Sequence, residues 1–466
     1  MKQTIIKCFR TRQEKYFYDR YTNSIVCVND AEYELLKRLE TGDQTAKNSP
    51  LLRRYTKKGL LRESIVETIE HPETRNVHYL LENQMGQLIL QVTQQCNLRC
   101  EYCAYSGKYN NRTHSKARML YETAIKAIDF YIARSKEVER LNISFYGGEP
   151  LLEYDLIKKC VAYCKNKIFD KEVIYHMTCN GTLLSADVRK FVISNKFHLT
   201  ISLDGNQMAH DKNRKYINGR GSFQSVIKNV SKLYDDDPLY YKQYVMFNSV
   251  INPNEEVENV WNFFQSGDLF FKGQVHFNGM ITKDLKNPED ANYSRNFFVI
   301  SRYEHLKQYM NMLGLLPEEK MHLSLYQDRE KAKSEFERFH SHQEEVKCMH
   351  HSGPCIPGVR RVMVDVNGNL FPCERITELE DKARIGNIED GFEEDNISNL
   401  LNIGKITCKE CKICWNLRNC NICAALILNG ESLYDTKLKQ CFAAREDTLQ
   451  KMRRMCILME SGYIGE

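Results

Sequence analysis

Hydrophobic and polar positions follow one rhythm at the start of the chain, in residues 1–82. Short alternating runs there are typical of strands, and Asn29 with Glu32 has the spacing of a capping box ahead of an amphipathic helix. Gly59 breaks the pattern after a second helical stretch. The expected elements are strands at 4–10, 15–18 and 24–28, a helix at 31–39, a second helix ending near 58 and a short strand at 60–63. Together they predict a small α+β module.

From about residue 87 the rhythm changes to short apolar runs that alternate with amphipathic stretches. The runs expected to be strands are 88–92, 141–145, 173–177, 199–203, 244–250 and 275–277. The stretches with helical spacing between them are 121–134, 154–167, 185–194, 223–234 and 255–264. Regular β–α alternation predicts a parallel sheet covered by helices, with functional residues at the carboxyl ends of its strands. Six units in residues 83–310 predict a partial (β/α)6 barrel, and therefore an α/β fold class.

The remaining sequence has few long apolar runs. Residues 311–346 predict a charged helical connector, residues 347–445 are rich in cysteine, and residues 446–466 continue a helical pattern that begins near Phe442. A cysteine-rich segment with so little apolar sequence cannot build much core, so we expect metal to hold it together. A chain of 466 residues is also too long for one ordinary core, and we expect several domains.

Composition excludes two classes of protein. Apolar residues make up 42% of the chain, but no apolar run approaches the roughly 18 to 20 residues that a membrane span needs. The formal net charge of +5 comes from 66 basic and 61 acidic residues, a balance that does not predict nucleic-acid binding. Residues 1–10 carry charges and lack a signal-peptide core, so we expect a cytoplasmic protein with no membrane and no nucleic-acid partner.

Cysteine is the residue type that changes the picture, because the chain contains 18 of them. In a reducing compartment, clustered thiols indicate metal binding rather than disulfides. Three cysteines fall within residues 96–103, and nine fall between Cys348 and Cys441. Most of the others are expected to be buried small hydrophobic side chains: Cys8, Cys27, Cys160, Cys164 and Cys179.

The first cluster of thiols is Cys96, Cys100 and Cys103, spaced C-x3-C-x2-C directly after the strand expected at 88–92. Three thiolates can bind three irons of a [4Fe-4S] cluster and leave the fourth iron open to a ligand that is not protein. The alternatives are a zinc loop or unrelated thiols. A structural zinc site needs four ligands, and the nearest histidine downstream is His114.

This loop, followed after the second strand by Gly147, Gly148, Glu149 and Pro150, resembles the radical S-adenosylmethionine (SAM) superfamily. The resemblance implies that the amino and carboxylate groups of SAM occupy the open iron. It also implies that the reduced cluster cleaves SAM to methionine and a 5′-deoxyadenosyl radical, which removes a substrate hydrogen. The Gly-Gly-Glu-Pro motif is then expected near the methionine amino group, where glycines let the backbone approach the ligand and Glu149 receives charge.

The resemblance assigns roles to four more residues. Ser202 is the candidate for binding a ribose hydroxyl, and Asp204 is a candidate catalytic residue of the active site. Arg214 is the candidate for the SAM carboxylate, because a guanidinium can bind a carboxylate through two hydrogen bonds. Tyr102 matches an aromatic position near adenine. The alternatives are ordinary turn chemistry for the first two and a core position for the tyrosine.

The C-terminal cysteines are spaced C-x12-G-x4-C over residues 355–373 and C-x2-C-x5-C-x2-C over residues 411–423. This layout resembles the SPASM domain of radical SAM peptide-modifying enzymes, which implies two auxiliary [4Fe-4S] clusters and three clusters in all. The ligands implied for the first auxiliary cluster are Cys348, Cys355, Cys373 and Cys423. The ligands implied for the second are Cys411, Cys414, Cys420 and Cys441.

Two departures from the SPASM pattern leave the second ligand set open. The last internal gap is two residues where the family usually has three, and Cys408 adds a thiol shortly before Cys411. Paired C-x2-C motifs also occur in zinc sites, so zinc remains an alternative. Glu374 directly follows Cys373, where sulfatase-maturing relatives carry a catalytic aspartate, and is a candidate proton acceptor.

The module of residues 1–82 resembles the winged-helix precursor-recognition domain of many maturases, in which a leader peptide adds a strand to the sheet edge. With the SPASM layout and Tyr105-Ser106-Gly107 after the cluster loop, the chain looks most like thioether-forming maturases of cysteine-rich ribosomally made peptides. The implied partners are a precursor peptide with a leader and a cysteine-rich core, and a flavodoxin or ferredoxin reductant. The alternatives are formylglycine formation, carbon–carbon crosslinking or epimerisation and, from another class, a non-catalytic iron–sulfur or zinc protein.

Overall fold

The computed structural model describes most of the chain, and all structural statements below concern the described residues. These are 3–105, 114–251, 257–266, 269–271, 273–279, 295–321, 332–335, 337–339, 342–351, 353, 355–428, 430 and 432–463. Ser106, Gly107 and part of the expected connector at 311–346 lie outside them. None of the described helices combines the length and the apolar character that a bilayer crossing requires.

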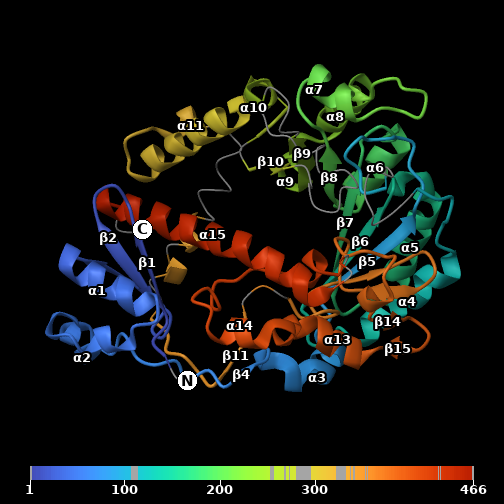
Figure 1. The fold of residues 1–466 in the computed structure, drawn as a ribbon. Helices are drawn as coiled ribbons and strands as arrows, with labels where there is room; N and C mark the ends of the chain where they lie inside the picture. Colours follow the sequence, from blue (N-terminus) through green and yellow to red (C-terminus); the bar gives the residue numbers. More distant parts are fainter. Residues whose placement is uncertain are drawn as a thin grey trace.

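The N-terminal module is a three-stranded antiparallel sheet with helix α1 packed on one face (Figure 1). Its elements are β1 (Ile6–Arg10), β2 (Lys15–Asp19), β3 (Ser24–Val28), α1 (Asp30–Glu40) and α2 (Arg53–Lys57). The expected capping box is confirmed, because the side chains of Asn29 and Glu32 each accept the other's backbone N–H. The strand expected at 60–63 is wrong. Leu61 has a left-handed φ of 59°, which a strand does not allow, and only Glu63 makes a single bridge.

The central sheet contains the six expected parallel strands in sequence order, at the right of Figure 1. They are β5 (Gln87–Thr93), β6 (Arg140–Gly147), β7 (Glu172–Cys179), β8 (His198–Ser202), β9 (Val245–Ile251) and β10 (Val275–Gly279). The helices between them match the expected ones, namely α4 (Tyr121–Ala133), α5 (Tyr154–Lys167), α6 (Ala186–Ser194), α8 (Phe223–Asp236) and α10 (Val257–Ser266). Two short helices were not expected, α7 (Gln207–Asn213) and α9 (Pro238–Tyr244). The sheet places all six strand ends on one edge, as barrel enzymes do.

The cysteine-rich region extends this sheet. Strand β12 (Val362–Val364) pairs in parallel with β5, and all three of its residues are fully buried. Antiparallel strands then continue the sheet: β13 (Asn369–Phe371), β14 (Gly386–Asn387) and β15 (Gly391–Phe392). The barrel and the cysteine-rich region therefore share one core, which the expected division at residue 347 did not foresee.

Other short elements connect the N-terminal part of the chain to the C-terminal part. Strand β4 (Thr68–Ile69) pairs with β11 (Cys348–Met349).

The remaining helices are α3 (Val77–Asn83), α11 (Arg295–Met312), α13 (Glu394–Leu401), α14 (Cys408–Lys412) and α15 (Leu433–Glu460). Helix α15 begins earlier than the sequence pattern indicated and so includes Cys441. It runs from the barrel side toward the N-terminal sheet (Figure 1), where Phe9, Tyr16 and Tyr18 pack against Leu449, Met452 and Met455.

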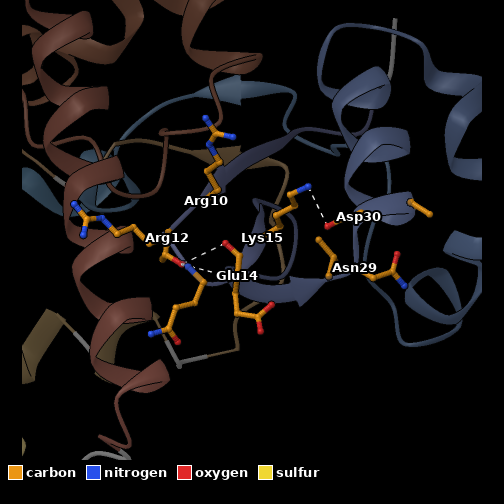
Figure 2. A pocket seen from close by; sticks show the side chains of 10 residues that line it. Arg10, Arg12, Glu14, Lys15, Asn29 and Asp30 are labelled. Atoms are coloured by element: carbon orange, nitrogen blue, oxygen red, sulfur yellow. Dashed lines mark hydrogen bonds and ion pairs between the residues drawn. The ribbon is translucent and has the colours of Figure 1, made fainter.

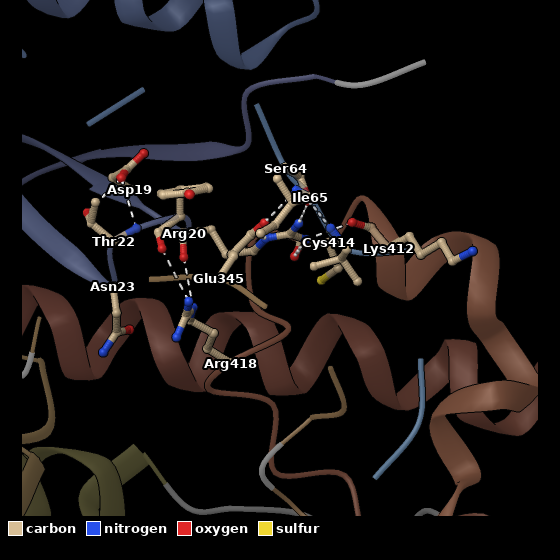
Figure 3. Close-up of polar contacts among 12 residues, drawn as sticks. Asp19, Arg20, Thr22, Asn23, Ser64, Ile65, Glu345, Lys412, Cys414 and Arg418 are labelled. Atoms are coloured by element: carbon tan, nitrogen blue, oxygen red, sulfur yellow. Dashed lines mark hydrogen bonds and ion pairs between the residues drawn. The ribbon is translucent and has the colours of Figure 1, made fainter. Parts of the chain in front are cut away.

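A buried polar network joins the N-terminal module to the cysteine-rich region (Figure 3). Arg20 forms an ion pair with Glu345 at 2.7 Å, and both side chains are at most 1% exposed. Its guanidinium also donates to the backbone carbonyls of Lys412 and Cys414, at 2.7 and 2.9 Å. Arg418 donates back to the carbonyl of Arg20 at 2.8 Å. The charge of Arg20 is thus compensated while its hydrogen bonds hold the Cys411–Cys414 loop.

Candidate functional site

The loop that carries Cys96, Cys100 and Cys103 leaves the carboxyl end of β5 and is braced from a second side. The backbone N–H groups of Arg99 and Glu101 donate to the carbonyls of Lys215 and Asn213, at 2.7 and 3.0 Å. The Arg99 guanidinium donates to the carbonyl of Cys96 at 2.7 Å. These bonds fix the loop conformation through the backbone.

The three thiols of this loop lie close together. The Cys96 Sγ accepts hydrogen bonds from Leu98 N–H at 3.4 Å and from Asn180 Nδ2 at 3.9 Å, and the Cys103 Sγ accepts one from Tyr105 N–H at 3.4 Å. Burial raises the pKa of Cys96 and of Cys100 to about 12, and the neighbouring thiols add to it. Metal binding displaces the protons of such thiols, and the hydrogen bonds to sulfur favour the resulting thiolates.

Three sulfurs on one loop suit an iron–sulfur cluster, in which each cysteine binds a different iron. Within the described residues, no three or more His, Cys, Asp or Glu side chains converge on one metal position. A [4Fe-4S] cluster does not require such convergence. The donor set of three sulfurs on one loop is therefore compatible with the expected cluster.

Gly147 and Gly148 are needed because the end of β6 approaches the cysteine loop. The N–H of Gly148 donates to the Thr93 carbonyl at 3.0 Å, and the N–H of Glu149 donates to the Gln95 carbonyl at 2.9 Å. A Cβ on Gly147 would lie 2.1 Å from the Thr93 oxygen, and one on Gly148 would lie 2.3 Å from the Gln95 oxygen. The contact that demands glycine is thus between two backbones, whereas the sequence suggested an approach to the ligand.

Glu149 is fully buried and joins the ends of two strands. Its carboxylate accepts the backbone N–H of Leu151 at 3.1 Å and that of Asn180 at 2.7 Å. Burial raises its pKa to about 7. Asn180, at the end of β7, also donates to the Asn97 side chain at 2.8 Å. Sequence reasoning gave Asn180 no role, although its position before a glycine at a strand end was a usable signal. Pro150 begins the short 3-10 helix that follows Glu149.

Tyr102, Asp204 and Arg214 meet beside the cysteine loop. The Arg214 Nε donates to an Asp204 carboxylate oxygen at 2.8 Å, and the Tyr102 hydroxyl donates to the same oxygen. The other oxygen of Asp204 accepts the N–H of Val250 at 3.0 Å. The guanidinium carbon lies 5.3 Å from the Tyr102 ring centre, and its charge opposes the rise in the pKa of Cys100. Three sequence-predicted residues are therefore brought together around one carboxylate.

These surroundings favour a different role for Asp204 from the one expected. Its side chain is fully buried and both oxygens are occupied, so it orients Arg214 and is poorly placed to exchange a proton with a substrate. Behind it, His210 accepts the N–H of Asp204 at 3.3 Å and lies 2.9 Å from the Ser222 hydroxyl. Ser202 is also buried, at the end of β8 and opposite Asn248 of β9, and its ribose contact stays a prediction.

Glu374 is held by arginine. Both of its oxygens accept hydrogen bonds from the Arg361 guanidinium, at 2.9 and 3.1 Å. This ion pair with Arg361 fixes the position of the carboxylate. Its role as a proton acceptor stays a prediction.

The C-terminal thiols form two groups. Cys355 and Cys423 lie close enough to Cys373 to raise its pKa, and Cys411, Cys414 and Cys441 lie close enough to Cys420 to raise its pKa. Cys348 is exposed on β11, with its sulfur 3.7 Å from the Glu70 carbonyl. Cys408 packs against Ile69, Met349 and Leu417, as does Cys411. The assignment of these thiols to two auxiliary clusters, and the role of Cys408, stay predictions.

Among the scattered cysteines, most are buried as expected: Cys8, Cys160, Cys164 and Cys179. The expectation is wrong for Cys27, which is exposed on β3, an edge strand of the N-terminal sheet. An alternating strand pattern cannot tell an edge strand from a central one.

Comparisons with known proteins agree with the barrel assignment. Residues 90–265 match the profile of the Radical SAM superfamily. The chain is 31% identical over 190 residues to a cysteine-type anaerobic sulfatase-maturating enzyme of Clostridium novyi, which covers 40% of this chain and 49% of that protein. It is 26% identical over 202 residues to the radical SAM cyclopropyl synthase TigE of Paramaledivibacter caminithermalis, covering 40% of each. These matches span about half or less of the relatives' length.

The fold is also shared with a solved structure. Native anSMEcpe with bound AdoMet and Kp18Cys peptide superposes with a TM-score of 0.55 and 21% identity, covering 79% of this chain and 99% of that one. At this identity the similarity shows the fold alone. Together with the profile match and the geometry of the cysteine loop, it establishes the central region: residues 90–265 of this chain are a radical SAM domain, homologous to those of sulfatase-maturating enzymes and TigE.

Proposed function

We propose that this chain is a radical SAM peptide maturase that forms a thioether bond between a cysteine sulfur and a carbon of a precursor peptide. The observation that carries the radical SAM part is the group of three neighbouring thiols at the end of β5, beside the Asp204–Arg214 pair. A cluster ligand set and a cation suited to a carboxylate are adjacent there. This is the pairing that SAM, with its amino-acid end, requires.

Specific residues would hold each group. Cys96, Cys100 and Cys103 would bind the [4Fe-4S] cluster, and Arg214 would receive the SAM carboxylate. Asp204 keeps the guanidinium in one orientation, because its carboxylate binds Nε and leaves the terminal N–H groups for another acceptor. When bound, the reduced cluster and SAM supply a radical able to remove a substrate hydrogen.

The remaining predicted contacts place the rest of SAM. The backbone around Gly147 and Gly148 would meet the methionine amino group, Ser202 a ribose hydroxyl and Tyr102 the adenine. Glu149 accepts two backbone N–H groups and so holds together the chain segments that follow β6 and β7, which would lie beneath the bound SAM. The buried core beneath it excludes water from the reacting groups.

The C-terminal thiols would bind two auxiliary [4Fe-4S] clusters in a SPASM-like domain. The first would use Cys348, Cys355, Cys373 and Cys423, and the second Cys411, Cys414, Cys420 and Cys441. The grouping of thiols in the structure supports this division. A flavodoxin or ferredoxin would supply electrons.

The N-terminal module would capture the leader of the precursor peptide. The two edge strands of this sheet are β1 and β3. Next to β1, the backbone of Thr4 is already paired with Glu63 in a β-bridge, so β3 is the better edge for an added strand. Beside it lies a surface cavity of about 960 Å³, between the β1–β2 turn and the start of α1 (Figure 2). Charged and amide side chains line it: Arg10, Arg12, Glu14, Lys15, Asn29 and Asp30. They offer a peptide both hydrogen-bond donors and acceptors, and both positive and negative charges.

A second candidate reaction is formylglycine formation, which the similarity to sulfatase-maturating enzymes favours equally. Product mass separates the two. A thioether forms with loss of two hydrogens and retention of sulfur, whereas formylglycine made from cysteine loses two hydrogens and also has the sulfur replaced by oxygen.

The test uses anaerobically reconstituted full-length protein with dithionite and SAM. We expect 5′-deoxyadenosine from the wild type and none from the Cys96→Ala, Cys100→Ala, Cys103→Ala triple variant. Cys160→Ala, which removes a buried barrel thiol outside the loop, is the control and should retain activity. A fully metallated wild type that forms no 5′-deoxyadenosine would refute the proposal.

A further inference from the structure

Lys437 is a buried cation in the cysteine-rich region. It lies on α15, one helical turn before Cys441, and is 1% exposed. Its ammonium donates to the hydroxyl of Thr407 at 2.7 Å and to the Sγ of Cys411 at 3.6 Å. Thr407 is itself fully buried. The lysine therefore places its charge inside the protein, against a thiol.

No ion pair compensates this charge within the described part of the chain. No Asp or Glu there forms an ion pair with Lys437, and its hydrogen bonds go to the hydroxyl and the sulfur just named. Glu410 is the carboxylate on the neighbouring helix α14; it is half-buried, accepts the Tyr434 hydroxyl at 2.6 Å and makes no ion pair with Lys437. A buried ammonium without an anion is strongly unfavourable, so the site needs a negative partner.

The groups that surround the ammonium point to the nature of that partner. Cys411 belongs to the set of four thiols completed by Cys414, Cys420 and Cys441, and Cys441 follows Lys437 by one turn of the same helix. Four thiolates around a [4Fe-4S] core carry a net negative charge that becomes one unit more negative on reduction. A cation beside one of the thiolates compensates that charge, and does so more strongly in the reduced state.

We propose that Lys437 is the charge-compensating residue of the second auxiliary cluster, and that it raises the reduction potential of that cluster through its contact with Cys411. The proposal rests on the proposed auxiliary clusters and adds a function that the cysteine spacing does not contain. Lys437 is a positioning and potential-setting residue, since its contact is to a ligand sulfur.

The experiment measures potentials and does not use activity. The Cys96→Ala, Cys100→Ala, Cys103→Ala background removes the SAM-binding cluster and leaves the auxiliary ones. In it we compare Lys437→Met, which removes charge and hydrogen bond, Lys437→Gln, which keeps a donor without charge, and Lys437→Arg, which keeps both. Lys439→Met removes an exposed lysine from the same helix and is the matched control. Iron content and redox titration followed by electron paramagnetic resonance are the readouts.

We expect Lys437→Met and Lys437→Gln to lower the midpoint potential of one auxiliary cluster and leave the other unchanged. Lys437→Arg and Lys439→Met should match the parent. Unchanged potentials in either neutral variant, at full iron content, would overturn the proposal.

Loss of a cluster is also informative. If the two neutral variants assemble one auxiliary cluster while Lys437→Arg assembles both, the charge is required and the proposal stands. If Lys437→Arg fails as they do, the lysine acts only through its shape and the proposal is overturned. A parent protein with no auxiliary cluster at all would instead refute the cluster assignment itself.

Discussion

The two thiol-bearing regions of this protein treat buried charge differently. Beside the barrel loop, Arg214 is paired with Asp204 at 2.8 Å, so its charge is compensated by the polypeptide. In the cysteine-rich region, Lys437 contacts a hydroxyl and a thiol and has no carboxylate partner among the described residues. In the barrel site the polypeptide itself compensates the buried positive charge. In the C-terminal site we propose that a bound anion compensates it.

The two regions also differ in the length of their strands. The barrel loop is held by strands of five to eight residues and by hydrogen bonds from a second segment. Strands β11 to β15 have two or three residues each. Short elements bury little surface and form few ladder bonds, so we expect metal binding and buried side-chain pairs to contribute more to the stability of the C-terminal region. Four variants test this comparison, described from the largest expected effect to the smallest.

Glu345→Gln should cause the largest loss, because it leaves Arg20 buried with an uncompensated charge. We expect the free energy of unfolding to fall by about 3 to 5 kcal/mol, and the Cys411–Cys414 loop to gain hydrogen exchange while β5 to β7 stay protected. Urea unfolding and exchange mass spectrometry measure the two effects. Lys126→Met breaks an exposed pair with Glu389 and should cost at most about 1 kcal/mol. Equal costs for both variants would contradict the role assigned to the buried pair.

Asp204→Asn should act on SAM and leave the C-terminal clusters intact. The amide cannot compensate Arg214, so the guanidinium loses its orientation, and we expect 5′-deoxyadenosine formation to fall by about 100-fold. The rate at saturating SAM and the iron content of the protein provide the measurement. Loss of iron in proportion to the loss of rate would instead show that Asp204 acts only on assembly.

Gly148→Ala should damage the barrel loop without changing any charge. The new Cβ would meet the Gln95 carbonyl at 2.3 Å, and the strain is expected to cost about 1 to 3 kcal/mol and to reduce iron at the barrel cluster. Gly279→Ala introduces a Cβ with no atom within 4 Å and is the control. Full iron content in Gly148→Ala would mean that the two loops can separate without cost.

The smallest effect concerns pH. Burial lowers the pKa of His210 to about 4 from 6.5, so the folded protein holds it neutral while the unfolded chain takes up a proton below pH 6.5. Stability from this group is present above pH 6.5 and is lost toward pH 4, by about 1.4 kcal/mol for each pH unit. Comparing urea midpoints of the wild type and His210→Asn at pH 7.5 and 5.5 should show a smaller pH effect in the variant. An identical pH effect would exclude His210 as its source.

The barrel was predictable because its strands are apolar on both faces and its helices are amphipathic, two patterns that local sequence carries. The cysteine loop was predictable for a similar reason, since its ligands lie within eight residues of one another. The prediction of a strand at 60–63 failed because two consecutive leucines are buried there in a loop. Buried apolar side chains do not require an extended backbone. The start of α15 was missed because its first turns are polar, with Lys437 among them.

The sequence by itself determined the alternation of strands and helices, the three-thiol loop and the spacing of the C-terminal cysteines, because each of these is a local pattern. Only the tertiary structure decided that β12 joins the barrel sheet, that Gly148 faces a backbone, and that Asp204 serves Arg214. It also decided that Lys437 is buried without a carboxylate. Charged residues look alike in sequence whether they meet water, a partner or a thiol, and their energies depend on which of these the fold brings within a few ångströms.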